Sequence, residues 1–464
     1  CFIPVEARTH HRAFNDFNQT PFANAFSLEK IVADMNHKAT TGILVKSLRT
    51  GKILYAQNAD QVFAPASNMK IITAFVALKF LGPDFVYKTR LLTDAPQLPA
   101  NGVLEGNLYL KYEGDPTLQL SDLDNLFRQL FQYGIHKITG NLYVDTTRYD
   151  AQGIAPGTEN TDDNYCYGAP VSSAILNRNC VTFKLIPDQI GSVAHLSFPY
   201  DVNLPVENSV VTSNKNNCHL SIKRGNNGHY VLSGCISRHS GKAFTIPIPA
   251  DCGYGEQAAA KCLMRNKIQI MGHDLPTHSE NNLKLLTLHE SKPLSVLVVE
   301  MMKKSDNLIA NTLFKTIGAL YMHRSATWEN SSYAERAILQ KNGIDIQNMT
   351  IIDGSGLSRE NQVTPTQLVQ VLTAAAKDPK IADIYLEALP VGGLNGTLKN
   401  RLGTRDIIGK VKAKTGSMHG VSSLSGFVET EHGEEIVFSI ILNNFAGGLY
   451  PYRLMEDKLC RILR

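Results

Sequence analysis

A serine and a lysine three positions apart open a predicted helix near the start of the chain. The segment 67–70 reads Ser-Asn-Met-Lys, apolar residues follow at helical spacing, and Gly82 with the next proline predicts where the helix ends. The i, i+3 spacing puts Lys70 on the same helical face as Ser67, so the amine can take the proton of the hydroxyl. This chemistry requires burial and neighbouring charge to lower the lysine pKa. The pair predicts a covalent serine nucleophile with a lysine base.

Two further motifs strengthen this interpretation. Ser-Asp-Asn at 305–307 lies where one predicted helix gives way to the next, which presents a hydroxyl and an amide to a cleft. Lys-Thr-Gly at 414–416 ends a predicted strand, where Gly416 lets a bulky ligand approach the backbone. Each motif alone is common: the segment 27–30 also reads Ser-x-x-Lys and is interpreted as an ordinary helix N-cap. The three motifs together, in this order, favour one active site.

The elements that must position these motifs come from both ends of the chain. Strand-like runs lie near the beginning and near the end, and helical patterns follow both sets. We therefore expect an α+β fold in which one antiparallel sheet is flanked by helices, with an inserted α/β domain and, inside it, a mostly-β domain. The expected domain boundaries are 1–84 and 280–464 for the domain with the sheet, 85–178 and 247–279 for the inserted domain, and 179–246 for the nested domain.

Composition excludes some classes of partner and names none. The 464 residues are 43% hydrophobic and 19% charged, with a formal net charge of +4 and no basic block, so nucleic acid is not an expected partner. No apolar run approaches the roughly 18 residues that a membrane-spanning helix needs. No metal or other cofactor is expected, because His-Glu-x-x-His is absent and the histidines are interpreted as surface or core residues.

The first residue and the cysteines bear on localisation. The numbering opens on Cys1 without an initiator methionine, which indicates a processed product. Lipid attachment at Cys1 and a simple cleavage product are the alternatives, and the bulky Phe2 favours the second. Six of the eight cysteines lie between positions 166 and 262, which favours an oxidising compartment and hence an exported, extracytoplasmic protein.

The three motifs resemble the signatures of active-site serine penicillin-binding proteins and β-lactamases. The resemblance is greater to the D-alanyl-D-alanine carboxypeptidase/endopeptidase branch with large inserted domains, because 238 positions separate Ser67 from Ser305. Four further segments match that branch, at 114–118, 353–359, 396–398 and 413–416. The resemblance implies a β-lactamase/transpeptidase-like fold and a periplasmic or cell-surface serine D,D-peptidase.

Roles of individual residues follow from the resemblance. Ser67 is implied to be the nucleophile, Lys70 its base, Ser305 a proton relay, Asn307 a partner of the substrate amide and Lys414 the positive charge for the terminal carboxylate. The residues implied to bind substrate along the third motif are Thr415, Gly416, Ser417, Met418 and His419.

The same resemblance implies a reaction and its partners. Attack on the D-Ala–D-Ala carbonyl gives an acyl-enzyme that water hydrolyses, while a β-lactam acylates Ser67 and leaves slowly. The backbone N–H groups of Ser67 and Ser417 are implied to hold the oxyanion, and such donors are typically worth roughly 3–4 kcal/mol each. The expected partners are therefore peptidoglycan stem peptides and β-lactams. The sequence leaves the oligomeric state, and the balance of carboxypeptidase and endopeptidase activity, open.

A pocket for the side chain of the third stem residue is also implied. The matching positions are Asp162, Tyr167 and Arg359, which suit a zwitterion such as meso-diaminopimelate: the aspartate pairs with the ammonium and the arginine binds the carboxylate. Two positions depart from the family pattern, since Glu159 replaces an expected aromatic residue and His419 stands where a small polar residue sits in relatives.

Three disulfides are expected. Cys218 and Cys235 flank a turn at 225–228, and a two-residue loop there places residues whose numbers sum to 453 opposite one another, at a Cα separation of about 4.5 Å. The other expected pairs are Cys166 with Cys180 and Cys252 with Cys262.

Rival functions remain open on the sequence. A β-lactamase shares the motifs, but such enzymes are usually much shorter, and the glutamate that a class A enzyme needs between the second and third motifs cannot be placed here. A catalytically idle peptidoglycan-binding relative is the alternative from another class, and the intact motifs disfavour it. A Ser-His-Asp hydrolase is disfavoured because no Gly-x-Ser-x-Gly occurs.

Overall fold

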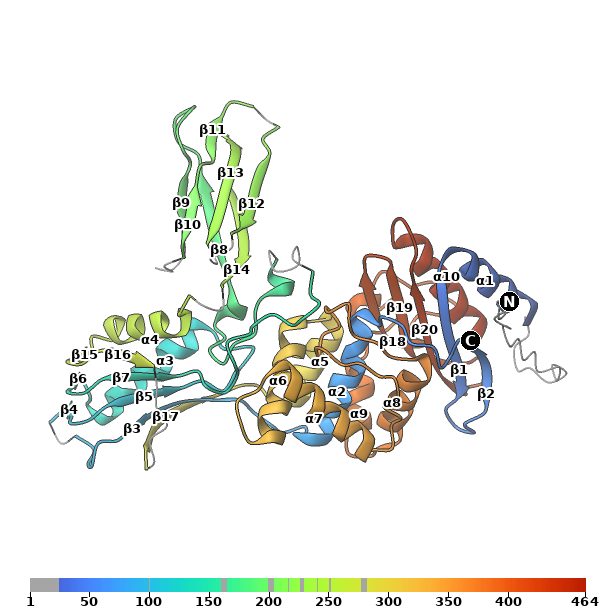
Figure 1. Cartoon of the computed structure of the whole chain (residues 1–464), viewed down its shortest axis with the longest axis horizontal. Coiled ribbons are helices and arrows are strands. Elements are labelled where there is room, and N and C mark those ends of the chain that lie inside the picture. The colour runs from blue at the N-terminus through green and yellow to red at the C-terminus, as the bar shows by residue number, and fades with distance from the viewer. Residues whose placement is uncertain are drawn as a thin grey trace, which may run out of the picture.

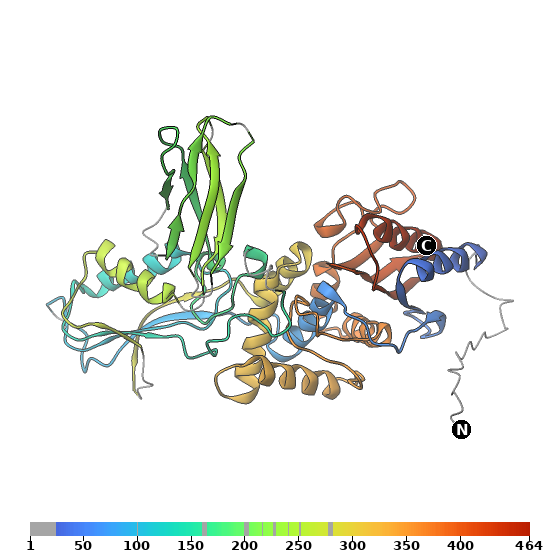
Figure 2. The ribbon, with the colours of Figure 1, turned by 45° about the horizontal axis from the view of Figure 1, so that its top comes forward.

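The computed structural model describes residues 25–99, 101–159, 165–198, 204–215, 217–225, 229–239, 241–249, 252–276 and 282–464. Within these residues the chain forms three bodies, seen apart in Figures 1 and 2. We call them the terminal domain (25–84 and 291–464), the inserted domain (85–178 and 248–290) and the nested domain (179–247). The nested domain stands out from the inserted domain, which lies beside the helical half of the terminal domain.

The terminal domain is built on one five-stranded sheet in the order β18-β19-β20-β1-β2. Its strands are β1 (Thr40–Ser47), β2 (Ile53–Gln57), β18 (Val411–Met418), β19 (Val421–Glu429) and β20 (Glu435–Asn443). All neighbours are antiparallel, and β1 pairs with β20 so that Leu44 lies opposite Ser439. The predicted antiparallel sheet from both ends of the chain is therefore confirmed.

Helices cover both faces of this sheet. The helices α1 (Ala25–Lys38) and α10 (Tyr450–Leu463) lie on one face, and α2 (Met69–Phe80) and α8 (Pro365–Lys377) lie on the other (Figure 1). Alternation along β1 explains the arrangement, because Ile43 and Val45 join the core under α1 and α10, while Leu44 joins the core under α2.

The helix α2 is central to the other half of the domain. Every residue from Met69 to Leu78 is buried, so the helix is surrounded by protein on all sides. Its neighbours are α5 (Leu294–Lys304), α6 (Asn307–Met322), α7 (Trp328–Lys341) and α9 (Ala382–Ala388). Any polar side chain that α2 carries at its first turn is therefore removed from water.

The inserted domain corrects one predicted boundary. Its main sheet has the order β16-β7-β5-β3-β17, and α3 (Leu120–Arg128) and α4 (Tyr254–Arg265) pack on it. Its strands are β3 (Lys88–Thr93), β5 (Leu108–Lys111), β7 (Leu142–Asp145), β16 (Asp274–Pro276) and β17 (Lys284–Glu290). Because β17 pairs with β3, the terminal domain resumes after Glu290, and the boundary predicted at 280 is wrong. The short strands β4 (Val103–Leu104), β6 (Lys137–Ile138) and β15 (Gln269–Ile270) form a small parallel sheet at its far end.

The nested domain is made of two small sheets, in the orders β14-β8-β9 and β10-β13-β11, with β12 added beside β13. Its strands are β8 (Cys180–Ile186), β9 (His195–Ser197), β10 (Val206–Asn208), β11 (Val211–Ser213), β12 (Leu220–Arg224), β13 (Tyr230–Ser237) and β14 (Lys242–Pro247). The first and last strands pair with each other, so the chain enters and leaves the domain at the same end.

Two of the expected disulfides are present. Cys166 is bonded to Cys180 and Cys218 to Cys235, with Cα separations of 6.0 Å and 5.1 Å. The hairpin register that predicted the second bridge is nevertheless wrong. Residues 226–228 of the expected turn lie outside the described residues, but Arg224 lies opposite Tyr230 and Gly225 donates its N–H to the carbonyl oxygen of His229. The numbers of opposite residues therefore sum to 454 in place of 453, and each pair is displaced by one position. The bridge forms because Cys218 lies just before β12, outside the strand pairing.

The third expected disulfide is wrong. Cys252 and Cys262 are not joined. Cys262 lies on α4, where it is buried, whereas Cys252 lies before the first residue of that helix, Tyr254. Eight residues of helix rise about 12 Å, well beyond the Cα separation that a disulfide spans.

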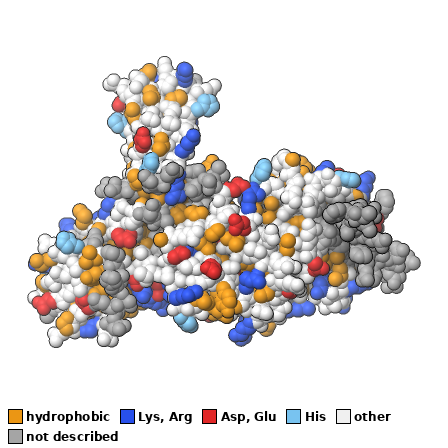
Figure 3. Space-filling view, viewed as in Figure 1, with side chains coloured by type: hydrophobic (Ala, Val, Ile, Leu, Met, Phe, Trp, Pro, Cys, Tyr) orange, Lys and Arg blue, Asp and Glu red, His pale blue; other side chains and the backbone are white. Residues whose placement is uncertain are grey.

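The surface shows no concentration of one charge on the face drawn in Figure 3, where blue and red side chains are interspersed. In the part of the chain that the structure describes, no helix has the length and apolar character to cross a membrane.

Candidate active site

Ser67 lies at the N-terminal end of α2. It belongs to the single 3₁₀ turn η1 (Ala66–Asn68), which runs directly into the helix. Lys70 is in the first helical turn, and its Nζ lies 3.0 Å from the Oγ of Ser67. The same Nζ also donates to Oδ1 of Asn307, at 2.7 Å, and to the carbonyl oxygen of Ser355, at 2.6 Å. The first two motifs therefore meet at one amine.

Burial gives Lys70 the electrostatics of a base. Its side chain is completely buried, and this desolvation lowers its pKa from 10.5 to about 7, although the carboxylates of Asp353 and Asp306 raise it. About half of the amine is therefore neutral near pH 7. A neutral amine 3.0 Å from a hydroxyl can accept its proton.

The second motif sits at the junction between two helices. Ser305 follows α5 in the left-handed conformation, with a φ of 57°, and Asp306 caps α6 by accepting from the backbone N–H of Ile309 at 3.0 Å. This sharp turn directs the hydroxyl of Ser305 toward Lys414, whose Nζ donates to it at 2.8 Å. The second and third motifs are thus joined as well.

The third motif brings the edge of the sheet against Ser67. A Cβ added to Gly416 on β18 would lie 2.7 Å from the carbonyl oxygen of Pro65 and 3.1 Å from the backbone nitrogen of Ser67. Only glycine permits this approach. Ser423 on the neighbouring strand donates to the same carbonyl at 2.8 Å, which fixes the turn that carries Ser67 to the sheet.

A cleft of about 290 Å³ opens above these groups. Its lining comprises Ser67, Glu159, Tyr167, Asn307, Gly356, Leu357, Arg359, Ser417, Met418 and His419. Seven of these were expected at the site from the sequence. Lys70 contacts two of the lining residues, Ser67 and Asn307, from below the cleft. Ser305 and Lys414 are outside the lining and are joined to each other, and Thr415 donates its hydroxyl to that of Thr397 at 2.7 Å.

The expected side-chain pocket is present in part. Arg359 and Tyr167 line the cleft, whereas Asp162 lies outside the described residues. Arg359 forms an ion pair with Glu159 and donates to the carbonyl oxygen of His419 at 3.0 Å. Glu159, which the sequence marked only as a departure, is therefore a charged member of the cleft. The ring of Tyr167 is half exposed and stacks on the ring of Tyr165.

Asp353 is the main functional candidate that sequence reasoning missed. It is completely buried and accepts from the backbone N–H groups of Gly356, Leu357 and Ser358, and from the side chains of Ser355 and Asn361. These bonds fold the segment that supplies Lys70 with a carbonyl partner. The Asp-Gly-Ser-Gly run was the available signal, since aspartate commonly accepts from backbone N–H groups in tight turns.

The comparisons with known proteins agree with this geometry. A model of the D-Ala-D-Ala carboxypeptidase 3 (S13) family matches residues 24–456. The D-alanyl-D-alanine carboxypeptidase DacB of Haemophilus influenzae is 30% identical over 439 residues, 93% of this chain and 91% of the relative. A D-alanyl-D-alanine carboxypeptidase of Actinomadura sp. (strain R39) is 30% identical over 431 residues, 88% of this chain and 78% of the relative.

Solved structures extend the likeness to three dimensions. Penicillin binding protein 4 of Haemophilus influenzae has a TM-score of 0.84 at 30% identity, covering 94% of this chain and 98% of that one. The same protein complexed with a novel β-lactam has a TM-score of 0.81 at 29% identity, covering 94% and 99%.

Proposed function

The chain belongs to the D-Ala-D-Ala carboxypeptidase 3 (S13) family, and from this premise we propose how its own residues carry out the reaction. It is a serine peptidase of the D-alanyl-D-alanine carboxypeptidase class and a penicillin-binding protein. The observation that carries the mechanism is the position of Lys70, whose buried amine contacts Ser67, Asn307 and the carbonyl of Ser355.

The first step forms an ester. Neutral Lys70 takes the proton of Ser67, and the Oγ attacks the carbonyl carbon between the two D-alanines. The backbone N–H groups of Ser67 and Ser417, which both line the cleft, are the proposed donors to the oxyanion. The C–N bond then breaks, and the terminal D-alanine leaves as an amine after receiving a proton from protonated Lys70, by way of Ser305.

The second step hydrolyses the ester and regenerates the free enzyme. Lys70 takes a proton from water and the hydroxide attacks the ester carbon. The C–O bond to Ser67 then breaks, Ser67 receives the proton held by Lys70, and the acid product releases its remaining proton to solvent and leaves as a carboxylate. With a β-lactam the C–N bond that breaks lies in a ring, so the leaving amine stays attached to the acyl group. It continues to occupy the side from which water must attack, and the adduct persists.

Lys414 is the proposed charge for the terminal carboxylate. It is fully buried, and desolvation lowers its pKa well below its usual value. A substrate carboxylate arriving beside Thr415 supplies a negative charge, which raises the pKa of Lys414 again and favours its protonated form. Binding and protonation are therefore coupled, and the amine bears its charge when the substrate is in place.

The substrate is proposed to carry a zwitterionic side chain of the meso-diaminopimelate kind. Glu159, Arg359 and Tyr167 line the same cleft as Ser67, which places a carboxylate, a guanidinium and an aromatic ring within reach of one stem peptide. The substrate carboxylate is expected to share Arg359 with Glu159, while its ammonium is held by Glu159 and Asp162. Peptidoglycan lies outside the cytoplasm, where disulfides such as Cys166–Cys180 persist, so an exported protein is proposed.

Labelled penicillin tests the nucleophile. One covalent adduct on Ser67, absent from Ser67→Ala, is expected by peptide mapping, and an adduct on Ser27 would contradict the assignment. The adduct should persist for much longer than a β-lactamase intermediate, and rapid turnover of penicillin would favour a β-lactamase. Defined muropeptides with product identification by mass would then give the balance between carboxypeptidase and endopeptidase cleavage.

The side-chain pocket needs its own comparison. Hydrolysis of a diaminopimelate peptide should exceed that of the lysine peptide, and Arg359→Ala should reduce the ratio. Equal rates on both peptides in the wild type would remove the proposed carboxylate recognition. An unchanged ratio in the variant would remove Arg359 from it.

A further inference from the structure

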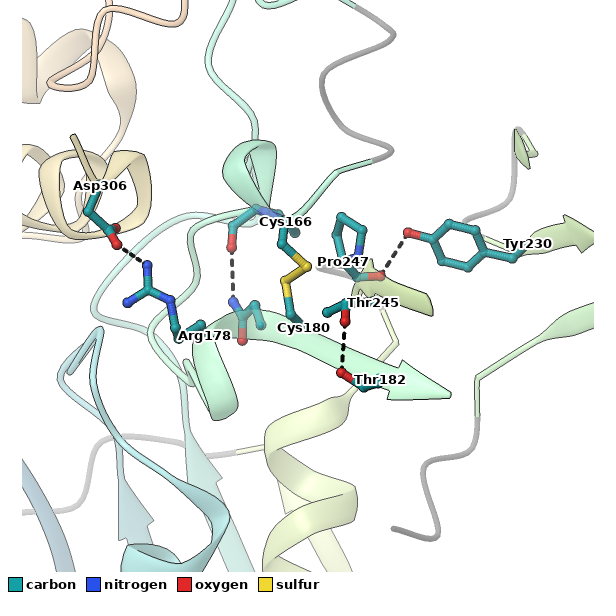
Figure 4. Close-up of a disulfide and its surroundings, with 10 residues drawn as sticks. Cys166, Arg178, Cys180, Thr182, Tyr230, Thr245, Pro247 and Asp306 are labelled. Atoms are coloured by element: carbon teal, nitrogen blue, oxygen red, sulfur yellow. Dashed lines mark hydrogen bonds and ion pairs between the residues drawn. A yellow bond between two sulfur atoms is a disulfide. The ribbon is translucent and has the colours of Figure 1, made fainter. Parts of the chain in front are cut away.

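A strap of residues 165–180, which runs from the inserted domain into the first residues of the nested domain, reaches the second motif. A disulfide between Cys166 and Cys180 joins its two ends (Figure 4). Near one end the carbonyl oxygen of Tyr167 accepts from Nδ2 of Asn307 at 2.9 Å, which orients the amide whose other atom contacts Lys70. Near the other end the guanidinium of Arg178 points at Asp306 and forms an ion pair with it (Figure 4).

The backbone that presents Arg178 is unusual. Asn177, Arg178 and Asn179 have φ values of 47°, 63° and 50°, so three consecutive residues other than glycine are left-handed. Asparagine tolerates this region, but it is uncommon for arginine. Leu118 and Leu120 of the inserted domain hold the turn, since Asn177 donates its N–H to the carbonyl of Leu118 and accepts the N–H of Leu120 through its side chain. Sparsely populated conformations that the surroundings maintain are concentrated at functional sites.

The partner of Arg178 occupies a sensitive position. The side chain of Asp306 is only 8% exposed, and this residue lies between Ser305 and Asn307, the two side chains that contact Lys414 and Lys70. One carboxylate oxygen caps α6, and the other faces the guanidinium. A largely buried carboxylate that lost this cation would turn toward water, and the helix junction would move with it.

We propose that Arg178 is a positioning residue for the reaction: it reaches from the inserted domain, holds Asp306, and so fixes Ser305 and Asn307 against the two active-site lysines. The inference rests on the proposed roles of Ser67 and Lys70. It gives the inserted domain a part in the chemistry, because in the described part of the chain the cation that pairs with Asp306 comes from the inserted domain.

Because Arg178 is charged, its removal should change the pH profile of acylation, which the loss of a purely structural residue would not do. Three charged groups face Lys70: Asp353 in the segment after α7, Asp306 at the cap of α6, and Lys414 on β18. Removing Arg178 leaves the negative charge of Asp306 less compensated, so the pKa of Lys70 should rise. The acid limb of the acylation profile should then move to higher pH, by about half a unit.

The experiment compares acylation of the full-length protein by a fluorescent penicillin. Arg178→Ala should acylate on the order of tenfold more slowly, as expected for a misplaced catalytic group. Arg178→Lys, which keeps the positive charge but lacks the planar guanidinium group, should recover part of the rate. Arg265→Ala is the matched control, because Arg265 pairs with Asp124 within the same inserted domain, and its rate should stay at the wild-type value. Thermal unfolding shows which variants are folded, and Arg178→Lys serves for the comparison if the alanine variant is not.

A double-mutant cycle identifies the route of the effect. In an Asp306→Asn background, Arg178→Ala should cause little further loss and no further shift of the acid limb. The inference would be overturned by wild-type rates in the Arg178 variants, or by losses that simply multiply in the double variant. Labelling of wild-type Ser67 tests the proposed function separately, since its absence would remove the nucleophile whatever the variants do.

Discussion

Lys414 and Lys70 are completely buried in the same site, and each contacts one side chain of the second motif. Desolvation lowers the pKa of Lys414 well below its usual value, and the positive charge of Lys70 lowers it further. This arrangement suits the proposed roles, in which Lys70 is neutral as the base and Lys414 becomes protonated when an anionic substrate arrives.

Acylation should follow the titration of Lys70. With a pKa of about 7, the neutral fraction and hence the acylation rate should rise about fivefold between pH 6 and pH 7, and less than twofold between pH 7 and pH 8. The measurement is the second-order rate constant with fluorescent penicillin. Lys70→Arg should abolish acylation, because guanidinium stays protonated. A rate that keeps increasing tenfold per unit beyond pH 9 would mean that Lys70 retains its ordinary pKa.

Gly356→Ala should displace Ser67, because Gly356 lies just after Asp353 in a segment that packs against the turn carrying Ser67. Gly356 has a φ of 82°, and an added Cβ would lie 1.8 Å from the carbonyl oxygen of Ala66 and 3.1 Å from the backbone nitrogen of Ser67. Acylation should fall on the order of a hundredfold, because the nucleophile must move. Gly433→Ala is the control, since Gly433 has a φ of 75° but nothing within 4 Å. Equal acylation by both variants would contradict the packing argument.

Asp353→Asn should destabilise the protein. The variant replaces one acceptor oxygen by an NH₂ group in a buried site that presents five donors. The free energy of unfolding should fall by about 2–4 kcal/mol, as measured in urea. Asp345→Asn, at an exposed turn where the side chain accepts one backbone N–H, should stay within about 0.5 kcal/mol of wild type. A similar small effect at both positions would show that Asp353 does not organise its segment.

Glu335→Gln should stabilise the protein increasingly as pH rises. Glu335 is fully buried on α7, neither carboxyl oxygen has a hydrogen-bond partner in the described structure, and desolvation raises its pKa from 4.5 to about 8. Above pH 4.5 the unfolded chain releases a proton that the folded protein keeps, so wild-type stability declines until the folded group ionises near pH 8.

Glutamine has no proton to release, so the stability difference between variant and wild type should grow between pH 5 and pH 8, by up to a few kcal/mol. Unfolding curves at several pH values measure it. Glu329→Gln, on an exposed face of the same helix, should show no such growth. A constant difference across this range would mean that Glu335 ionises in the folded protein as it does in the unfolded chain.

Peptide mapping without reduction should recover Cys166 joined to Cys180 and Cys218 joined to Cys235. Cys262 should resist alkylation in the native protein, because it is buried and desolvation raises its pKa to about 12. It should react after denaturation. Recovery of a Cys252–Cys262 bridge would contradict the helical separation described above.

Much of the terminal domain could be predicted because its signals are local. A strand-like run near the beginning of the chain predicted the strand that is β1, and the spacing of Ser67 and Lys70 predicted a shared helical face. These relationships extend over one strand or one helical turn, which is the range over which periodicity determines where side chains point.

Two of the errors concern partners that are distant in sequence. The strand β17 was placed with the terminal domain because nothing in its own residues identifies β3 as its neighbour. Glu159 was noted only as a departure from an aromatic residue in the family pattern. Its partner Arg359 is 200 positions away, so its own neighbours in the sequence give no sign of the ion pair. The hairpin register was wrong for a local reason, since β12 and β13 pair one position away from the register that a two-residue loop would give.

The order of strands in the terminal sheet also governs when the enzyme can become active during its own synthesis. The strand β1 lies between β2 and β20, so its inner edge has no partner until residues 435–443 have been made. Chains generally fold from the N-terminus as they emerge, and the inserted and nested domains, which end by Glu290, are free to do so first. Ser67 and Lys70 are translated early, but Ser417 follows 350 residues after the nucleophile. A growing chain therefore carries Ser67 and Lys70 long before the strand that supplies Ser417, and the complete site forms only after the last strands of the sheet have been made.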